Sequence, residues 1–143
     1  MSDFRFFHPV EVRYGDLDPQ GHLNNAKYLT YFEQARIQYM VELGLFEKQR
    51  SFLDLGLIMA DVQITFRAPV QWGDPIKVGV RTSRIGNKSM DMEQAILNGK
   101  TGDVLASGKV ICVAYDYRKN ETIRVPDFWR ETLQQYEGLE QAA

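Results

Sequence analysis

One stretch of the chain repeats its apolar residues at the spacing of a helix that other elements must cover. From Ala26 to Leu43 these residues recur every three or four positions, with few polar residues between them. This spacing predicts a helix of about four turns that is apolar around more than half of its circumference. The apolar positions are Ala26, Tyr28, Leu29, Tyr31, Phe32, Ala35, Ile37, Tyr39, Met40 and Leu43. Such a helix needs a second layer against most of its surface, and Gly44 is a suitable end for it.

The other regular patterns predict strands, which can supply that layer. Val10, Val12 and Tyr14 alternate with polar residues, as expected for a strand with one buried face. Four later runs have the composition of strands and are separated by turn signals such as Gly86-Asn87 and Asn98-Gly99. These runs are residues 57–67, 76–85, 90–98 and 104–117. The last three follow one another closely and predict an antiparallel meander.

Two shorter helical segments complete the expected elements. Residues 45–55 are expected to form an amphipathic helical connector that ends at Gly56. Residues 126–136 begin with a Pro-Asp pair, which is typical of a helix start. Phe128, Trp129 and Leu133 are the expected apolar contacts of this second helix.

The order of the elements indicates the fold class. A strand, a long buried helix and then at least four strands predict an α+β fold in which helix and sheet are segregated. At 143 residues, the chain is expected to form a single domain, residues 1–143. A sheet of one early strand and four later ones has two exposed edges and covers only part of the helix. We therefore expect a homodimer, in which two sheets can pair edge to edge.

The composition is that of a folded protein without a nucleic-acid or membrane partner. A formal charge of −2 and the lack of a long Lys/Arg cluster argue against binding to a polyphosphate backbone. The one cysteine, Cys112, lies in an apolar run and favours a core residue in a reducing compartment. The first residues are acidic rather than basic, and no apolar stretch approaches the roughly 18 residues that cross a membrane. We therefore expect a cytoplasmic protein.

Known metal and cofactor motifs are missing or incomplete. Residues 16–21 begin like a calcium-binding loop, but the twelfth position, which must be a bidentate glutamate, is Lys27. Zinc needs three or four ligands, and His8, His22 and Cys112 are the only nitrogen and sulfur candidates. The sequence also lacks a nucleophile elbow, a phosphate-binding loop and a dinucleotide fingerprint. We therefore expect no metal and no cofactor.

The acidic turn places carboxylates directly before the long helix. Asp16 and Asp18 are followed by His22 and by Asn24 and Asn25, either of which can cap the first turn. Unpaired amides at the positive end of a helix can polarise a carbonyl group and stabilise an oxyanion. A nearby carboxylate can attack that carbonyl or activate water, but it is a modest nucleophile and a weak base. The electrophile should therefore be reactive, which makes thioester hydrolysis the favoured reaction.

The motif around the turn has a known counterpart. It reads YGDLDPQGHLNN from Tyr14 to Asn25, and Tyr28 and the run Glu33-Gln34-Ala35-Arg36 follow it. In these residues, and in strand order and length, the chain resembles hotdog-fold acyl-CoA thioesterases of the 4-hydroxybenzoyl-CoA thioesterase type. The resemblance implies a long helix wrapped by a five-stranded antiparallel sheet, edge-to-edge dimers and, in many members, homotetramers. It also implies an acyl-CoA substrate, of which CoA is a part and not a cofactor.

The resemblance also implies roles for individual residues. Asp18, the second aspartate of the motif, would be the nucleophile or the general base, and amides around residues 25–27 would hold the thioester carbonyl. His22 either fixes the shape of the turn or transfers a proton. Glu33 either pairs with Arg36 on the helix surface or is the catalytic helix carboxylate that some members use. The expected catalytic residues are Asp18, His22, Asn25 and Glu33.

The remaining residues of the motif are expected to contact the substrate, while Asp16 is expected to fasten the turn through backbone hydrogen bonds. The resemblance suggests that CoA lies at a subunit interface, with its phosphates near basic residues of the meander. The expected substrate-binding residues are Gly21, Asn24, Ala26 and Tyr28, together with Arg84, Lys88 and Ser89 at the hairpin turn.

The chain departs from the 4-hydroxybenzoyl prototype after the glycine of the motif. The prototype has apolar residues there, whereas this chain has His22-Leu23-Asn24-Asn25. The broader acyl-CoA branch of the family and the plant acyl-carrier-protein thioesterases are similar to this chain at that point. The acyl group and the thiol carrier therefore stay open, and a non-catalytic acyl-CoA binding module is a further alternative.

Overall fold

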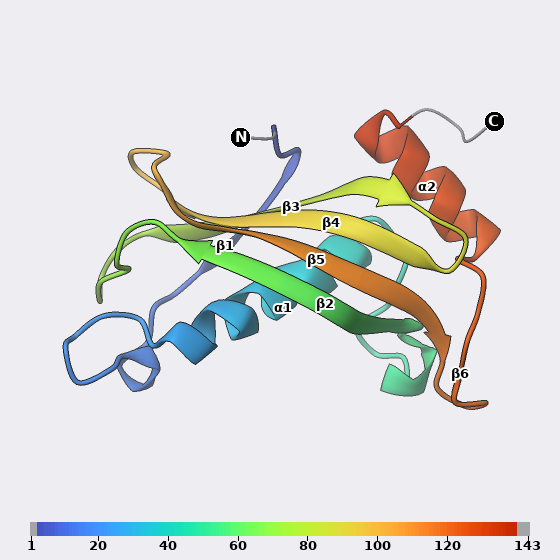
Figure 1. The fold of residues 1–143 in the computed structure, drawn as a ribbon, viewed down its shortest axis with the longest axis horizontal. Coiled ribbons are helices and arrows are strands. Elements are labelled where there is room, and N and C mark those ends of the chain that lie inside the picture. Colours follow the sequence, from blue (N-terminus) through green and yellow to red (C-terminus); the bar gives the residue numbers. More distant parts are fainter. Residues whose placement is uncertain (1–2, 140–143) are drawn as a thin grey trace.

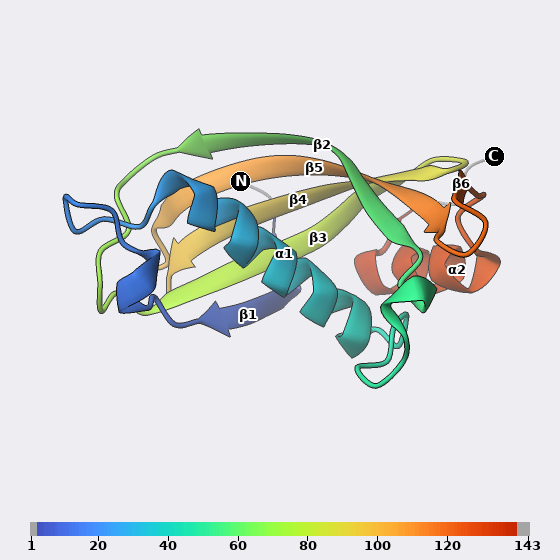
Figure 2. The same cartoon turned by 90° about the horizontal axis from the view of Figure 1, so that it is seen from below.

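The computed structural model describes residues 3–139, which form one curved sheet with a long helix on its concave side (Figures 1 and 2). The strands are β1 (Phe6–Val10), β2 (Leu57–Phe66), β3 (Ile76–Ile85), β4 (Ser89–Asn98), β5 (Val104–Asp116) and β6 (Glu121–Thr122). The helices are α1 (Asn25–Glu42) and α2 (Asp127–Glu137), with short 3-10 helices at Tyr14–Asp16 and Phe52–Asp54. The predicted α+β class is confirmed.

The sheet is antiparallel and has the strand order β1-β3-β4-β5-β2, with β6 paired to the end of β5. Strands β3, β4 and β5 form the predicted meander, since each pairs with the next along the chain. The first strand joins this meander at the β3 side, where Val10 lies opposite Ile76. Pro9 lies within β1 at this edge, which is where a strand tolerates a residue without an amide donor.

Helix α1 lies along the concave face of the sheet (Figure 2) and packs most closely against β1, β3 and β4. It has 18 residues, somewhat more than the four turns predicted. Asn24 is the N-cap, because its side chain accepts a hydrogen bond of 2.9 Å from the Ala26 amide. Gly44 follows the helix with a φ of +76°, so the predicted end is also confirmed.

Phe32 joins the middle of α1 to the sheet. Its side chain is only 1% exposed, and a Cβ atom at Gly108 of β5 would lie 2.6 Å from its ring. The glycine therefore leaves the space that Phe32 occupies. Gln94 of β4 adds a polar contact at the same level, because its side-chain amide donates to the Phe32 carbonyl over 2.9 Å. The helix is thus held by both apolar packing and a buried hydrogen bond.

Three predictions of local structure were wrong. The strand predicted from Val10, Val12 and Tyr14 ends at Val10, because pairing with β3 stops at Ile76. Val12 is still buried, but it lies outside the strand, and Tyr14 begins a 3-10 helix. Residues 45–55 contain only the short helix Phe52–Asp54. In α2, Trp129 and Leu133 are buried as predicted, but Phe128 is 61% exposed. Helical spacing puts Phe128 on the outer face of this short helix.

Strand β2 forms the second edge of the sheet and leaves large apolar side chains in contact with solvent. Ile58, Met59 and Phe66 are 40–50% exposed, and Leu29 on the neighbouring face of α1 is 39% exposed. This is the part of the sheet that α1 covers least. Among the described residues, neither helix has the length and apolar composition needed to cross a lipid bilayer.

Candidate active site

The aspartates of the motif lie in a small hairpin that leads into α1. Leu17 pairs with Leu23, and the amide of Asp18 donates to the His22 carbonyl over 2.8 Å. The Gly21 amide donates to the Asp18 carbonyl over 3.0 Å, and Gly21 has a φ of +80°. Aspartate, proline and glycine thus stand at the first, second and fourth positions of a turn whose glycine has positive φ. The sequence Asp-Pro-Gln-Gly explains why the chain reverses here.

The Asp18 side chain is held by this turn. Its Oδ1 atom accepts hydrogen bonds from the amides of Gln20, over 2.9 Å, and His22, over 3.1 Å. Its Oδ2 atom makes no hydrogen bond to another described residue. One oxygen therefore fixes the orientation of the carboxylate, and the other is available to a substrate or a water molecule.

Asp18 also acts electrostatically on the first turn of α1. Burial raises the pKa of the Tyr28 hydroxyl, and the negative charge of Asp18 raises it further. The Tyr28 ring is 3% exposed and packs edge-on against Phe66 of β2, with ring centroids 4.8 Å apart. Tyr28 therefore joins the first turn of α1 to β2.

The first-turn amides of α1 are only partly available. The Ala26 amide is bound by the Asn24 side chain, and the Lys27 amide donates to the Asn24 carbonyl over 2.8 Å. The Asn25 amide makes no hydrogen bond to another described residue. Of the amides expected to hold a carbonyl, Asn25 is therefore the donor that a ligand can use without displacing a protein contact.

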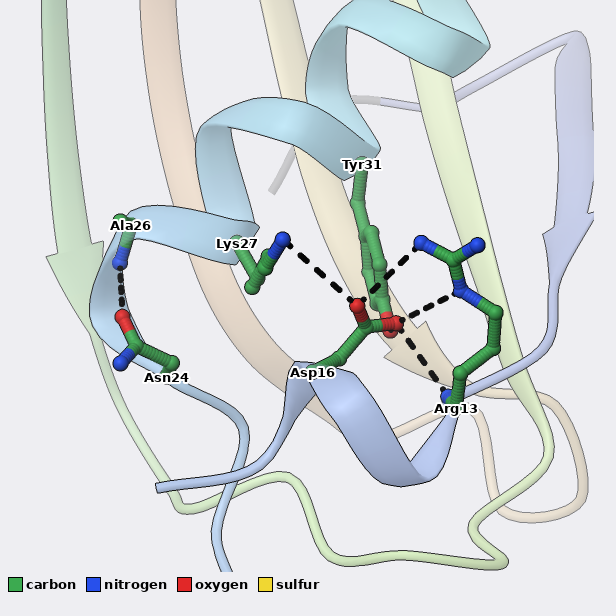
Figure 3. Close-up of polar contacts among 6 residues, drawn as sticks. All are labelled: Arg13, Asp16, Asn24, Ala26, Lys27 and Tyr31. Atoms are coloured by element: carbon green, nitrogen blue, oxygen red, sulfur yellow. Dashed lines mark hydrogen bonds and ion pairs between the residues drawn. The ribbon is translucent and has the colours of Figure 1, made fainter.

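Asp16 occupies a different position from Asp18 and is 2% exposed. Figure 3 shows its carboxylate between Arg13, Lys27 and Tyr31. The Tyr31 hydroxyl donates to Oδ2 over 2.8 Å, the Arg13 amide donates to the same atom over 3.2 Å, and Lys27 Nζ lies 3.9 Å from Oδ1. Burial alone would raise the pKa of Asp16, but hydrogen bonds from Tyr31 and Arg13 outweigh it and lower the pKa. Asp16 thus joins the turn to α1.

We expect Asp16→Asn to destabilise the protein by about 1.5–3 kcal/mol at neutral pH, because charged hydrogen bonds in a buried site are lost. Since the pKa of Asp16 is lowered in the folded state, its contribution is present above the ordinary aspartate pKa of about 4 and disappears as pH falls through the lower folded value. Urea unfolding of both proteins from pH 7 to pH 3 measures this. A stability difference that stays constant over this range would contradict the assignment.

The turn is fastened to the loop between β2 and β3. The Leu23 amide donates to the Val70 carbonyl over 2.7 Å, and His22 pairs with Gln71. The His22 side chain is half-buried and makes no hydrogen bond to another described residue. Neither of its two predicted roles is therefore decided by its contacts. Sequence patterns gave no signal for the loop around Val70, because this contact joins segments far apart in the chain.

The remaining predicted residues lie away from Asp18. Glu33 is exposed on α1, two turns beyond the helix start, and forms no ion pair with Arg36 or another described residue. Arg84, Lys88 and Ser89 lie at the β3–β4 turn, nine residues along β3 from the end that Val10 reaches. At about 3.3 Å per residue, this separation is roughly 30 Å. Within a single chain, these three residues are therefore far from the turn that contains Asp18.

No group of three or more His, Cys, Asp or Glu side chains within residues 3–139 is arranged to hold a metal ion. Cys112 is fully buried, and burial raises the pKa of its thiol to about 11. Cys112 is therefore a core residue, as predicted.

This fold and motif belong to a known family. A model of the Thioesterase-like superfamily matches residues 12–133, which include the turn, α1 and all of the meander. The chain is therefore a member of the Thioesterase-like superfamily. The family resemblance seen in the motif from Tyr14 to Asn25 is confirmed at this level.

Individual relatives agree with this assignment. The chain is 25% identical to the long-chain acyl-CoA thioesterase FadM of Escherichia coli K12, over 88% of this chain and 95% of FadM. It is 28% identical to the acyl-CoA thioesterase YbgC of Haemophilus influenzae, over 88% of this chain and 92% of that protein. A thioesterase from Thermus thermophilus, solved with coenzyme A and zinc, superposes with a TM-score of 0.83 and 31% identity over 96% of this chain and 98% of its own.

Proposed function

We propose that this protein hydrolyses acyl-CoA thioesters to a free carboxylic acid and CoA. The observation that carries the proposal is the Asp18 carboxylate, held by Oδ1 in a turn that runs directly into the N-terminus of α1. FadM and YbgC, which share the family and most of their length with this chain, are named acyl-CoA thioesterases. The Thermus thermophilus relative was solved with coenzyme A, which supports CoA as the thiol carrier.

In the proposed reaction, the thioester carbonyl oxygen accepts a hydrogen bond from the Asn25 amide at the positive end of α1. Charge that develops on this oxygen is then stabilised by a donor already in place. The free Oδ2 atom of Asp18 either attacks the carbonyl carbon or removes a proton from an attacking water. In both cases a C–O bond forms, the C–S bond breaks, and the sulfur leaves as a thiolate that takes up a proton. Attack by water gives the acid directly, whereas attack by Asp18 gives an anhydride between Asp18 and the acyl group, which water then hydrolyses to the acid and the free carboxylate. Single-turnover hydrolysis in ¹⁸O-labelled water tests for direct attack, because label found in the Asp18 carboxylate arises only when water hydrolyses an anhydride at the Asp18 carbonyl.

The other predicted residues have supporting roles in this proposal. Tyr28 packs on Phe66 and joins the first turn of α1 to β2. Asn24 keeps the helix start ordered through its bond to Ala26, and Gly21 allows the turn to close. His22 and Glu33 stay candidates for proton transfer. None of these roles needs a metal ion or a further cofactor.

We propose that the active unit is a homodimer formed through the exposed edge of β2. The apolar side chains that this strand exposes would be covered, and two antiparallel β2 strands would continue the sheet. In such a pair the Arg84 to Ser89 turn of one subunit lies toward the α1 start of the other. This would place Lys88 and Arg84 within reach of the CoA phosphates.

We expect light scattering to give twice the mass of one chain, or four times that mass if dimers pair further. The physical reason is the row of unpaired backbone groups and apolar side chains along β2. Measurement over a hundredfold range of protein concentration provides the control for weak association. A monomer throughout this range would contradict the proposed dimer and the shared CoA site.

Release of free thiol from a panel of acyl-CoA esters tests the proposed activity. We expect turnover with at least one ester and its loss in Asp18→Asn. Acyl-carrier-protein esters are assayed in parallel. Hydrolysis of these esters alone would show that the thiol carrier of the substrate is acyl carrier protein and not CoA. Saturable binding of acyl-CoA without thiol release would contradict hydrolysis and favour a binding module.

A further inference from the structure

Arg36 is a buried cation without a carboxylate partner. Its side chain is 5% exposed, and Nη1 donates to the Gln94 side-chain oxygen over 3.0 Å. The amide of Gln94 is itself used by the Phe32 carbonyl, so Gln94 is fully engaged and neutral. The guanidinium has five N–H donors, and no ion pair joins Arg36 to a described residue. A buried charge of this kind is costly unless a ligand or partner compensates it.

Arg36 lines two neighbouring cavities between α1 and the strands β2 and β5. Their volumes are about 130 Å³ and about 430 Å³, and Glu33, Arg36 and Met59 contribute to both. Most of the other lining side chains are apolar, among them Leu29, Val62 and Leu57. Figure 2 shows α1 crossing the concave face of the sheet, with β2 at the edge of that sheet. The cavities therefore form an apolar groove with one buried cation in its wall.

The groove lies along α1 beyond its first turn, and neither Asp18 nor Asn25 lines it. The smaller cavity includes Leu29, which is one helical turn beyond Asn25. Arg36 is eleven residues beyond Asn25, which is about 16 Å along the helix at 1.5 Å per residue. An acyl group whose carbonyl lies at the Asn25 amide and whose chain follows α1 would thus meet the guanidinium at its far end.

The charged and titratable neighbours do not neutralise Arg36. Burial raises the pKa of the Cys112 thiol to about 11, so this member of the larger cavity is uncharged at neutral pH. The Tyr117 hydroxyl is already bound to the Leu57 carbonyl over 2.6 Å. Glu33 contributes a carboxylate to the walls, but its side chain is exposed and lies beyond ion-pair distance of the guanidinium. Arg36 therefore forms no ion pair with a described residue of the groove, and Glu33 is the one acidic residue among those residues.

We propose that Arg36 binds a carboxylate at the distal end of the acyl group, so that ω-carboxyacyl-CoA esters are the preferred substrate class. This inference rests on the proposed hydrolysis of acyl-CoA. A guanidinium matches a carboxylate because two of its N–H groups can donate in parallel, and the low polarity of the groove strengthens the pair. Apolar walls accept the methylene chain between the two ends. A site built to bind a charged group also disfavours esters that leave it unpaired.

The proposal is tested with paired substrates of equal chain length, one ending in a carboxylate and one in a methyl group. The measured quantity is the ratio of their kcat/KM values across a series of lengths. We expect the wild-type ratio to favour the carboxylate by about tenfold or more, which is the usual effect of a charged hydrogen bond. Arg36→Met should abolish this preference, and Arg36→Lys should retain part of it. Arg124→Met, which removes the same charge from an exposed site outside both cavities, should keep it.

The failures of the two proposals are distinguishable. Hydrolysis of both substrate types with a ratio near one, or a ratio that Arg36→Met leaves unchanged, would overturn the carboxylate site and leave the thioesterase activity. If no ester releases thiol, calorimetric binding of the paired esters to wild-type protein and Arg36→Met tests the carboxylate site alone. Dissociation of the dimer in Arg36→Met, detected by light scattering, would overturn the proposal by making the guanidinium a subunit contact.

Discussion

Replacing Asp18 with asparagine is expected to lower kcat about a hundredfold to ten-thousandfold while the fold is retained. The asparagine side-chain oxygen can still accept the hydrogen bonds that Gln20 and His22 donate to Oδ1. The turn should therefore form, and the loss of the negative charge at Oδ2 is the main change. The magnitude follows from the usual contribution of a positioned acid, base or nucleophile. Initial rates of thiol release and circular dichroism measure the two parts of the prediction.

Two further substitutions serve as controls for this result. Asp18→Ala removes both the charge and the turn acceptor, so it should lose activity and some stability. Asp16→Asn removes a carboxylate from the same segment, but its expected cost is mainly in stability because its oxygens are bound by Tyr31 and Arg13. Wild-type kcat in Asp18→Asn and Asp18→Ala would remove Asp18 from the mechanism.

The second large effect is expected at the contact between α1 and the sheet. Phe32→Ala should reduce the free energy of unfolding by about 3–5 kcal/mol, as is usual for deletion of a buried aromatic ring. Collapse of the cavity is limited because the ring rests against the backbone at Gly108. The hydrogen bond from the Gln94 side chain to the Phe32 backbone carbonyl also holds the helix in place in the variant. Equilibrium unfolding in urea measures the loss as a lower transition midpoint.

Leu29→Ala is the matched control, since Leu29 lies one turn earlier on the same helix and is 39% exposed. It should cost less than about 1 kcal/mol in a monomer, because a partly solvated side chain loses little on truncation. Equal losses in the two variants would mean that Phe32 does not anchor the helix. A large loss in Leu29→Ala alone would indicate that this side chain is covered by a second subunit.

The long helix and the meander were predictable because each has a strong local signal. The apolar spacing from Ala26 to Leu43, with Asn24 before it and Gly44 after it, defines α1 within one residue at either end. The turns at Gly86 and Asn98 delimit β4 in the same way. The start of β1 was missed because its limits depend on where pairing with β3 begins and ends, which no local pattern reports.

The candidate site was predictable in its residues but less so in its contacts. The motif and the family resemblance singled out Asp18, and the Asp-Pro-Gln-Gly turn explains how its side chain is fixed. The partnership of Asp16 with Tyr31 depends on the angle between the turn and α1, so spacing along the chain could not predict it. One of the two roles expected for Glu33 was an ion pair with Arg36, because residues three apart on a helix are neighbours. In the structure the Arg36 guanidinium turns inward to Gln94 instead.

Pro9 limits how far this sheet can be extended by other chains. A proline in an edge strand leaves a gap in the row of donors that an incoming strand would need, so β1 is a poor template for growth. Strand β2 contains no proline along its length. The β2 edge can accept another strand, whereas Pro9 makes the β1 edge a poor acceptor. If two β2 edges pair, no good edge is left for a third chain. In the proposed dimer, the pyrrolidine ring of Pro9 would therefore help to stop growth of the sheet into fibres.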